Sequence, residues 1–334
     1  MIQVLGESKE GISAAYFTGD EIGRLNRVID LADVLVICRA RYSNALRQLI
    51  TRARSKGVRV LFDIDDLVFD PEYVPLLVQT ADQQSYPTAW QYWHEYVTQI
   101  EATLHLCEAI ITTNSYLAAL IATFCRQVAH VIPNFLNREQ IAISQRIFNR
   151  KQNHGFAKNE QIYLGYFSGT PVHNRDFKLI SDALISLFKR DRRVTAMIVG
   201  FLNLDGEILN YSSRIKFYPL QDFINLQRFI GMVDVNLAPL RSNPISNCKS
   251  ELKYFEAGIV GTVTVASPTF AYANTIRDGE NGCLADISEW EAKLESIINP
   301  RGNYQRMAEE AYTDSERKYA WYNQLALIEK TLFP

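Results

Sequence analysis

The stretch Asn247-Cys-Lys-Ser-Glu-Leu-Lys-Tyr-Phe-Glu-Ala-Gly-Ile-Val-Gly-Thr-Val-Thr-Val-Ala-Ser267 decides the fold of this chain. Its first half is typical of a loop followed by a short helix, which we expect over residues 250–258. Gly258 and Gly261 permit a tight return, because glycine adopts backbone conformations that other residues avoid. The β-branched apolar run over 262–266 predicts a strand covered on both faces. The stretch therefore indicates a helix–turn–strand unit of an α/β fold.

The same stretch carries polar groups suited to a phosphate ligand. Backbone amides at Lys249 and Ser250 would lie at the start of the predicted helix, where free N–H groups and the helix dipole attract anions. Lys249 and Lys253 would add positive charge for a diphosphate. Glu256 lies one to two turns further on and would accept hydrogen bonds from two ribose hydroxyls. The alternative is an amphipathic helix whose charged side chains are only solvated.

Short apolar runs alternate with longer helical patterns on both sides of this stretch. Such an alternation predicts parallel sheets joined by right-handed crossovers. We expect strands at 34–38, 58–62, 109–112, 130–132, 162–167, 194–199, 215–217, 233–238 and 262–266. We expect helices at 42–56, 88–105, 115–125, 174–190, 221–231, 250–258 and 288–297.

This alternation is interrupted between residues 133 and 160, where the polar and basic segment 146–159 is expected to be a surface helix or the end of a linker. The interruption predicts an α/β protein with two Rossmann-like, doubly wound domains, over 1–135 and 136–314. A helix over about 315–334 is well placed to pack back on the first domain. The carboxyl ends of both sheets, where ligands usually bind, would face one interdomain cleft.

Composition narrows the class of protein. The 334 residues are 47% hydrophobic and 22% charged, as in ordinary globular proteins, and the net charge of -2 argues against a nucleic-acid partner. The 5 cysteines are scattered and lack CxxC spacing, which indicates reduced thiols in a cytosolic protein. No signal peptide or membrane-spanning run is visible. We expect a cytoplasmic protein with, at most, peripheral contact with the inner face of a membrane.

Two further blocks accompany the opening stretch. Tyr163–Phe177 reads as a strand that ends in a Ser-Gly-Thr turn before a helix, and the amides at Gly169 and Thr170 would cradle a second face of a phosphate. Arg277-Asp-Gly-Glu-Asn-Gly-Cys-Leu284 reads as a turn that leads into the last strand.

Together these blocks resemble the C-terminal half of retaining glycosyltransferases of the GT-B fold, glycosyltransferase family 4. The family pattern reads roughly "E, seven residues, E-A-x-x-x-G-x-P-V-V-A-S", then "I-x-D-G-x-N-G-x-L". Here Glu256-Ala257, Gly261, Val263–Ser267 and Ile276–Leu284 match it in order and spacing. Val131-Ile-Pro-Asn134 also resembles the family's interdomain hinge. The resemblance covers about 110–334 well and the first hundred residues weakly.

The resemblance implies a glycosyltransferase that moves a sugar from a nucleoside diphosphate sugar (of UDP, GDP or dTDP type) to a glycan, lipid-linked or other hydroxyl acceptor. It implies retention of configuration, no cofactor and no essential divalent cation. Glu256 would bind the nucleotide ribose, and the Lys249–Ser250 turn would bind the donor phosphates.

The sequence departs from the family pattern in places that bear on activity. Cys248 stands where the first Glu of the paired motif is expected, and Glu251 is the neighbour that would replace it. The Arg and Lys expected near the first strand of the C-terminal domain are absent, because Tyr166 stands near the Arg position and His173, Asn174 or Arg175 near the Lys position. The candidates for neutralising the leaving diphosphate are therefore Lys249, Lys253, Arg175 and Arg241. A catalytically silent subunit that binds nucleotide sugar or glycan remains the alternative, and an epimerase of similar fold is a third option.

The stretch Phe62-Asp-Ile-Asp-Asp-Leu67 places carboxylates directly after a predicted strand. Asp63-Ile-Asp65 would be a metal-binding DxD in the other major glycosyltransferase fold, GT-A, but that fold does not explain residues 247–284. In the GT-B relatives this position lines the cleft, so the resemblance implies that Asp65 and Asp66 contact sugar hydroxyls or that Asp65 acts as acceptor base. Asp70, followed by Pro71, is predicted to cap a helix.

The segment Tyr73–Tyr96 is rich in aromatic side chains, which stack on sugar faces. An acceptor site is one interpretation of the aromatics over 86–96. Core packing of an amphipathic helix is the favoured interpretation for Trp93 and Tyr96.

Overall fold

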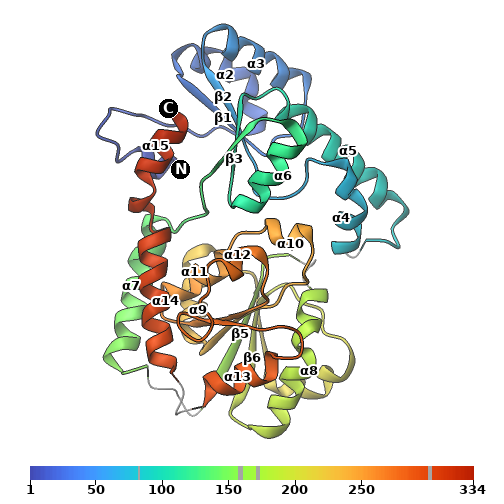
Figure 1. Ribbon diagram of the computed structural model, residues 1–334, viewed down its shortest axis with the longest axis vertical. Helices are drawn as coiled ribbons and strands as arrows, with labels where there is room; N and C mark the ends of the chain where they lie inside the picture. The colour runs from blue at the N-terminus through green and yellow to red at the C-terminus, as the bar shows by residue number, and fades with distance from the viewer. Residues whose placement is uncertain (82, 157–160, 171–173, 300–302) are drawn as a thin grey trace. The chain divides into compact units, whose positions relative to one another are not determined.

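The computed structural model describes residues 1–81, 83–156, 161–170, 174–299 and 303–334 (Figure 1). These residues form two compact units, each of which contains a parallel sheet with helices packed on it. The predicted α/β class with parallel sheets is therefore confirmed. Unit 1 contains Met1–Asn134, Asn247–Ser250 and Gln324–Pro334, and unit 2 contains Phe135–Ser246 and Glu251–Asn323.

The sheet of unit 1 has four parallel strands, β1 (Val34–Cys38), β2 (Arg59–Asp63), β3 (Ala109–Thr112) and β4 (Val128–Val131), in that spatial order. Cys38 is paired with Asp63, and Asp63 with Ile111, so the carboxyl ends of β1, β2 and β3 lie at one edge. The α-helices of this unit are α1 (Ile2–Leu5), α2 (Ile22–Val28), α3 (Asn44–Ser55), α4 (Val74–Thr80), α5 (Pro87–Leu104), α6 (Ser115–Cys125) and α15 (Leu325–Leu332). Its 3-10 helices are η1 (Gly19–Glu21), η2 (Ile29–Leu31) and η3 (Pro71–Tyr73).

Side-chain caps explain where several of these helices begin. The hydroxyl of Ser43 accepts a hydrogen bond from the amide of Leu46 at the start of α3, and Asn114 does the same for Leu117 at the start of α6. Asp70 accepts from the amide of Glu72 at 2.9 Å, with Pro71 in the first position of η3. The prediction that Asp70 caps a helix is confirmed.

Helix α15 is part of unit 1 although it comes last in the chain. The guanidinium of Arg59, at the start of β2, donates to the carbonyl oxygens of Thr331 and Leu332 in the last turn of α15. These carbonyls have no partner within the helix, so a cation at this end satisfies them and complements the helix dipole. Ser8 and Glu329 add a hydrogen bond between the first residues and α15.

The sheet of unit 2 has six parallel strands in the order β10-β9-β8-β5-β6-β7. The strand order reverses between β5 and β8, which places a topological switch point, the usual ligand position in such sheets, at their carboxyl ends. The strands are β5 (Ile162–Ser168), β6 (Val194–Gly200), β7 (Ile215–Tyr218), β8 (Val235–Ala238), β9 (Val263–Ala266) and β10 (Cys283–Leu284). The helices are α7 (Arg138–Asn153), α8 (Asn174–Arg190), α9 (Phe223–Met232), α10 (Pro244–Cys248, whose last two residues belong to unit 1), α11 (Leu252–Gly258), α12 (Phe270–Ala273), α13 (Trp290–Ile298), α14 (Tyr304–Tyr319), η5 (Gly206–Arg214) and η6 (Trp321–Asn323).

At two positions of unit 2 the backbone adopts a conformation that favours glycine. Gly261 has φ +64° in the turn between α11 and β9, as the sequence predicts for a tight return. Gly200 has φ +97° at the end of β6, and a Cβ atom there would lie 2.0 Å from the carbonyl oxygen of Ser168. Strands β5 and β6 therefore approach each other closely at their carboxyl ends.

The structure corrects one of two predicted elements and bears out one alternative for the other. The helix expected at 250–258 begins only at Leu252, and residues 249–251 separate it from α10, a helix that sequence reasoning missed. Within the segment 146–159, expected to be a surface helix or the end of a linker, residues 146–153 are helical, as the first alternative predicts. They form the second half of α7, which packs against α14 through the stacked rings of Phe148 and Tyr312, 3.7 Å between centroids. Residues 157–160 of that segment lie outside the described residues.

Two further observations concern the whole described chain. All five cysteines are free thiols. Among the described helices, none combines the length and the apolar character that a membrane span needs.

Candidate functional site

Unit 1 gathers charged side chains at the carboxyl edge of its sheet. Arg39 directly follows β1, and Asp65 and Asp66 follow the neighbouring strand β2. Nη1 of Arg39 lies 3.1 Å from Oδ1 of Asp65 and 2.8 Å from Oδ2 of Asp66. Nε of Arg39 donates to the hydroxyl of Tyr96 at 3.1 Å. One guanidinium thus holds both predicted aspartates and one residue of the aromatic segment.

The backbone and the charges of this group are both unusual. Arg39 has φ 43°, a left-handed conformation that costs energy for a residue other than glycine. Burial opposes the positive charge of Arg39, but Asp66, Tyr96 and Asp65 together raise its pKa. Asp63, which sequence reasoning grouped with Asp65, is largely buried, and this burial, reinforced by the charge of Asp65, raises its pKa to about 6. A strained, charge-balanced group at a ligand edge is typical of a functional site.

The segment Asn247–Ser250 belongs to unit 1 and is anchored there by two asparagines. The side-chain amide of Asn114, which also caps α6, donates to the carbonyl oxygens of residues 247, 248 and 249, the shortest being 2.8 Å to Cys248. Asn134 donates to the hydroxyl of Ser250 at 3.0 Å. Nζ of Lys249 lies 3.9 Å from Oδ1 of Asp66.

This anchoring corrects the predicted phosphate turn. The sequence places the amides of Lys249 and Ser250 at a helix N-terminus, but α11 begins at Leu252 and has Glu251 as its N-cap. Lys249 instead joins the aspartates of unit 1, whereas Lys253 belongs to unit 2. Cys248 is fully buried, and burial, with a further contribution from Asp66, raises the pKa of its thiol to about 12.

Unit 2 places several predicted residues around its switch point. Gly169 and Thr170 follow β5 and are exposed, and the carbonyl of Thr170 accepts a hydrogen bond from Ser168 at 3.0 Å. Arg241 follows β8, and its amide donates to Oδ1 of Asp176, in the first turn of α8, at 3.1 Å. Nε of Arg241 is buried, lies 3.8 Å from the same oxygen, and has no hydrogen-bond partner among the described residues. Arg175 lies beside Asp176 in α8, while the predicted residue His173 lies outside the described residues.

Helix α11 contributes Lys253 and Glu256 to unit 2. Nζ of Lys253 lies 5.1 Å from the centre of the Tyr166 ring, so the tyrosine that stands near the expected Arg position is covered by a lysine. Glu256 is only 8% exposed, and Gln140 of α7 donates to it at 3.5 Å. Burial raises the pKa of Glu256 to about 7, although Lys253 and Gln140 oppose this.

The remaining predicted residues have structural partners. Glu251, the proposed substitute for the missing Glu at Cys248, is buried and accepts a hydrogen bond from the hydroxyl of Tyr319 at 2.6 Å. In the turn before β10, Asn281 is fully buried and donates to Asp314 of α14 at 2.7 Å. This turn, predicted to lead into the last strand, therefore also attaches α14 to the sheet.

Sequence reasoning missed Arg39 and an apolar group in unit 2. Arg39 could have been found, because a residue that follows β1 must lie beside residues that follow the parallel strand β2. The apolar side chains are about half exposed and follow β6 and β7 in the chain, the last of them as the first residue of α9. They are Phe201, Leu220 and Phe223, at 44%, 55% and 50% exposure.

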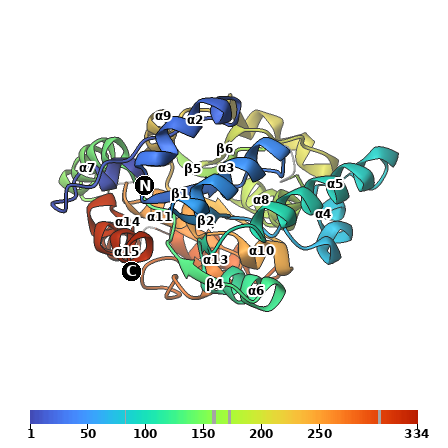
Figure 2. The same cartoon turned by 90° about the horizontal axis from the view of Figure 1, so that it is seen from above.

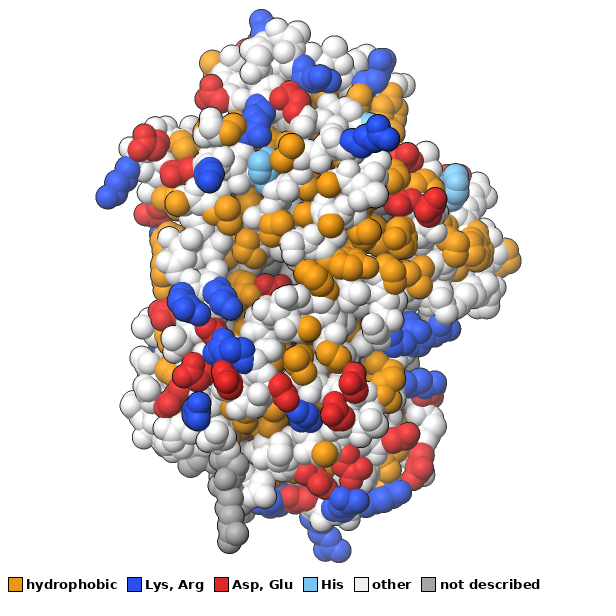
Figure 3. All heavy atoms as spheres, in the orientation of Figure 1, with side chains coloured by type: hydrophobic (Ala, Val, Ile, Leu, Met, Phe, Trp, Pro, Cys, Tyr) orange, Lys and Arg blue, Asp and Glu red, His pale blue; other side chains and the backbone are white. Residues whose placement is uncertain are grey.

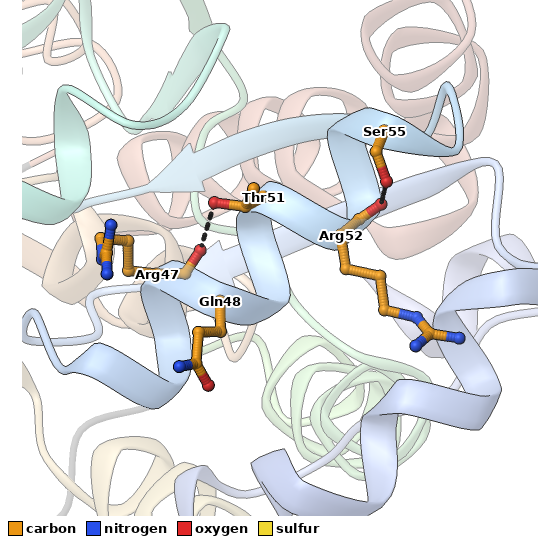
Figure 4. Close-up of a pocket in the computed structure, with 5 residues that line it drawn as sticks. All are labelled: Arg47, Gln48, Thr51, Arg52 and Ser55. Carbon is orange, nitrogen blue, oxygen red and sulfur yellow. Dashed lines mark hydrogen bonds between the residues drawn. The ribbon is translucent and has the colours of Figure 1, made fainter.

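Two other features do not coincide with the predicted site. A shallow depression along α3 is lined by side chains of that helix alone, and none of the predicted site residues lines it (Figure 4). Within the described ranges, no group of three or more His, Cys, Asp and Glu side chains is arranged to hold a metal ion.

Comparison with known proteins adds an independent result. Residues 161–299 match the family described as "Glycosyl transferases group 1". None of the curated proteins compared with the chain matches it.

Solved structures resemble the chain over nearly its whole length. The Anabaena protein Alr3699/HepE in complex with UDP is 18% identical, with a TM-score of 0.61 over 93% of this chain and 81% of that chain. Sucrose-phosphate synthase (tll1590) from Thermosynechococcus elongatus is 13% identical, with a TM-score of 0.62 over 96% and 81%. A point mutant of S. aureus TarM in complex with fondaparinux, alpha-GlcNAc-glycerol and UDP is 14% identical, with a TM-score of 0.61 over 94% and 58%. At these low sequence identities, the structural similarity establishes the fold alone. The chain thus has the GT-B fold of two Rossmann-like domains, and its residues 161–299 match the glycosyl transferases group 1 family.

Proposed function

We propose that this protein transfers a sugar from a nucleoside diphosphate sugar to a hydroxyl group of a glycan or lipid-linked acceptor, with retention of configuration and without an essential metal ion. The observation that carries the proposal is the buried Nε of Arg241 at the switch point of a glycosyl transferases group 1 domain. This nitrogen has no hydrogen-bond partner among the described residues and lies only 3.8 Å from Asp176. A buried donor without an acceptor is costly, and a phosphate oxygen would satisfy it.

Unit 2 would bind the donor. Arg241, Arg175 and Lys253 supply positive charge around the switch point, and the turn at Gly169 and Thr170 supplies backbone amides. These groups would balance the charge that develops on the departing diphosphate, a task that a divalent cation performs in other enzymes. Lys249, held near Asp66 in unit 1, is a further candidate for this charge.

Glu256 would accept hydrogen bonds from the ribose, and it is the deprotonated carboxylate that accepts most strongly. The exposed side chains of Phe201, Leu220 and Phe223 would pack against the nucleobase, because they lie at the carboxyl ends of β6 and β7. Alr3699/HepE has been solved with UDP and with UDP-glucose, which supports a UDP-sugar as the first donor to test.

Unit 1 would bind the acceptor. Asp65 and Asp66 are both paired with Arg39, and carboxylates that a guanidinium holds in place suit the binding of sugar hydroxyls. The side chain of Asp65 is 53% exposed and that of Asp66 29%, so the oxygen of Asp65 that Arg39 does not use is open to a ligand. The other oxygen of Asp66, Oδ1, already lies 3.9 Å from Nζ of Lys249.

The proposal is tested by calorimetric titration of the full chain with UDP, GDP and dTDP, followed by assays of donor hydrolysis in the presence of EDTA. We expect one of the nucleotides to bind and its sugar conjugate to be hydrolysed slowly. Arg241→Ala and Glu256→Ala should each weaken binding of that nucleotide at least tenfold. Arg228→Ala, an exposed arginine of α9 that contacts Asn225, is the matched control and should leave binding unchanged. Absence of nucleotide binding, or a strict requirement for a divalent cation, would contradict the proposal.

A second candidate function is a silent subunit that binds nucleotide sugar without transferring it. It is favoured by Cys248, which stands in place of a family glutamate, is fully buried and cannot supply a carboxylate. Nucleotide binding without turnover, across a set of donors and acceptors, would favour this candidate over the enzyme.

A further inference from the structure

The charged residues of unit 1 are divided unevenly along its sequence. The segment from Val34 to Phe62, which contains α3, has seven basic residues and no aspartate or glutamate. The following segment, 63–125, has nine aspartates and glutamates and neither lysine nor arginine. Residues 19–62, which add the shorter helices η1, α2 and η2, contain nine basic and four acidic residues, whereas the whole chain has a net charge of -2. Unit 1 therefore concentrates positive charge around α2 and α3.

Four basic side chains of this region are exposed and form no ion pair with another described residue. They are Arg24 and Arg27 of α2, Arg47 of α3 and Lys56, the C-cap of α3.

The other arginines of α3 are compensated by nearby carboxylates. Nη2 of Arg52 lies 2.6 Å from Oδ2 of Asp30, and Nε of Arg54 lies 4.0 Å from Oε1 of Glu108. The remaining acidic residues of 19–62 are Asp20, Glu21 and Asp33. The nine basic residues of that range outnumber all of its carboxylates, so its net charge stays positive.

Helices α2, η2 and α3 form one continuous surface. The ion pair between Arg52 and Asp30 joins α3 to η2, and η2 begins directly after the last residue of α2. Helix α2 also packs on α3, and both ribbon views show the two helices side by side (Figures 1 and 2). Lys and Arg side chains stand out over this region at the top of Figure 3. In the shallow depression of α3, Arg47 and Arg52 project to either side of the uncharged Gln48 and Thr51 (Figure 4).

An exposed leucine lies beside these charges. Leu31 is the last residue of η2 and directly follows Asp30, which Arg52 holds. Its exposure of 88% is the highest among the described large hydrophobic side chains, and Val28 at the end of α2 is 39% exposed. Ile29 between them is buried, so the turn is anchored by one apolar side chain while it presents Leu31 to solvent. A single exposed leucine is common, but a leucine within a basic surface is typical of proteins that bind membrane interfaces.

Charge and apolar exposure together decide which partner this surface fits. Basic side chains attract anionic lipids, nucleic acids and acidic polysaccharides alike. Of these partners, the lipid surface also takes up a leucine, because its acyl chains lie directly beneath the phosphate groups. Nucleic acids are often bound by aromatic side chains as well, and the sequences of α2, η2 and α3 contain no aromatic residue. An anionic plane would also repel the acidic segment 63–125 and so orient the basic one toward itself.

We propose that the surface formed by α2, η2 and α3 docks on an anionic membrane. Lipid phosphate groups bind the four unpaired basic side chains, and the side chain of Leu31 enters the boundary between the head groups and the acyl chains. Docking of this kind brings the protein to lipid-linked acceptors. Only that last role rests on the proposed function, because binding to vesicles is measured without nucleotide or acceptor.

The test is co-sedimentation of the full chain with mixed vesicles of phosphatidylglycerol and phosphatidylcholine, and with vesicles of phosphatidylcholine alone. A double-stranded DNA oligonucleotide and heparin are the other anionic probes, measured by fluorescence anisotropy in the same buffer. We expect binding to the mixed vesicles that increases with their phosphatidylglycerol content, and at least about tenfold weaker binding to the other probes and vesicles. Raising the salt concentration from ~0.1 M to ~0.5 M should weaken binding to the mixed vesicles, because it screens the charges.

Variants locate the binding on this surface. Arg47→Gln and Arg24→Gln should each weaken binding to mixed vesicles about fivefold, which corresponds to the loss of one basic residue near an anionic surface. Leu31→Ser should weaken it about tenfold, because the buried apolar side chain is lost. The matched controls lie in unit 2: Arg228→Gln removes an exposed arginine of α9, and Ile287→Ser removes a side chain that is 70% exposed. Far-UV circular dichroism and thermal unfolding verify that each variant is folded.

Several outcomes would overturn the inference. These are equal binding to mixed and phosphatidylcholine vesicles, tighter binding of DNA or heparin than of mixed vesicles, vesicle binding that Arg47→Gln or Leu31→Ser leaves unchanged, or equal losses in these variants and their controls. The outcomes also separate this inference from the proposed function. A protein that binds UDP but no vesicles contradicts only the inference, and one that binds vesicles but no nucleotide contradicts only the proposed function.

Discussion

Nη1 of Arg39 lies 2.8 Å from Oδ2 of Asp66, and the two residues follow neighbouring strands of one parallel sheet. The same nitrogen reaches Asp65, and Nε of Arg39 reaches Tyr96. A single side chain after β1 therefore determines how two carboxylates after β2 and one tyrosine of α5 are arranged.

Arg39→Ala should impair acceptor binding and leave the donor unaffected. The two aspartates would lose the cation that orients them and offsets their mutual repulsion. We expect affinity for the acceptor to fall at least tenfold, because hydrogen bonds to charged groups contribute about 1.5–3 kcal/mol. UDP affinity should stay the same. Arg41→Ala, which removes a neighbouring guanidinium without an ion pair to these aspartates, is the control, and equal effects of the two substitutions would refute the assigned role of Arg39.

Nucleotide binding should depend on pH through Glu256. Its pKa is raised to about 7 by burial, so lowering the pH below 7 protonates the group that is proposed to accept from the ribose. We expect UDP affinity to fall by up to about tenfold per pH unit below pH 7 and to level off above about pH 8. Calorimetric titrations from pH 5.5 to pH 8.5 measure this. UDP itself titrates equally in wild type and Glu256→Gln, so identical pH profiles of the two proteins would exclude Glu256 as the ribose ligand.

The same carboxyl group makes the stability of the folded protein decrease with rising pH, whereas it makes UDP affinity increase. Its pKa in the folded state, about 7, is above the ordinary value of 4.5. The folded state therefore binds the proton more tightly, and this contribution to stability is complete below about pH 4.5 and is lost as the pH rises through about 7. Glu256→Gln should remove that loss, as urea unfolding at pH 5 and pH 8 would measure.

Gly200→Ala should destabilise unit 2 strongly. A Cβ atom at this position would collide with the carbonyl oxygen of Ser168, and the φ of +97° is itself unfavourable for alanine. We expect a loss of about 3 kcal/mol or more in the free energy of unfolding. Gly206 provides a matched control, because it has φ +73° but no atom within 4 Å of the added Cβ. Gly206→Ala should cost only about 1 kcal/mol. Equal losses for the two variants in urea unfolding would contradict the collision.

Lys151 should make stability increase with pH above neutrality. Its amine is buried against the hydroxyl of Thr262 at 2.7 Å, and burial lowers its pKa from 10.5 to about 7. Between about pH 7 and pH 10 the unfolded state binds a proton that the folded state does not, so the free energy of unfolding increases with pH by up to about 1.4 kcal/mol per unit. Lys151→Met should abolish this increase. Urea unfolding of both proteins at pH 7, 8 and 9 checks the prediction, and parallel slopes would disprove it.

The strands and longer helices could be predicted because local patterns determine them. Strands β1 and β3 and helices α6 and α8 begin and end where the apolar periodicity places them. Asp70 is recognisable as a cap from three residues, because an N-cap is a local arrangement. The family resemblance also rests on contiguous blocks, and residues 161–299 match the glycosyl transferases group 1 family.

The site was harder to predict because its contacts join distant parts of the sequence. Asn114 binds carbonyl oxygens of residues 247–249, more than 130 positions away, and no local pattern near either segment indicates this. These hydrogen bonds from Asn114 determine where α10 ends and α11 begins. They also place Lys249 in unit 1. The burial of Glu256 beside Gln140 was hard to predict for the same reason, since the two residues are 116 positions apart. The roles given to these side chains in substrate binding stay predictions.

The way the chain divides between its two units has a consequence for synthesis in the cell. Proteins leave the ribosome N-terminus first, and domains fold as their residues emerge. Every residue of unit 2 is made before residues 324–334, which supply α15 to unit 1. Until then the guanidinium of Arg59 lacks the carbonyl oxygens of Thr331 and Leu332 that it binds in the finished structure. The unit that emerges first is therefore the one that completes its folding last.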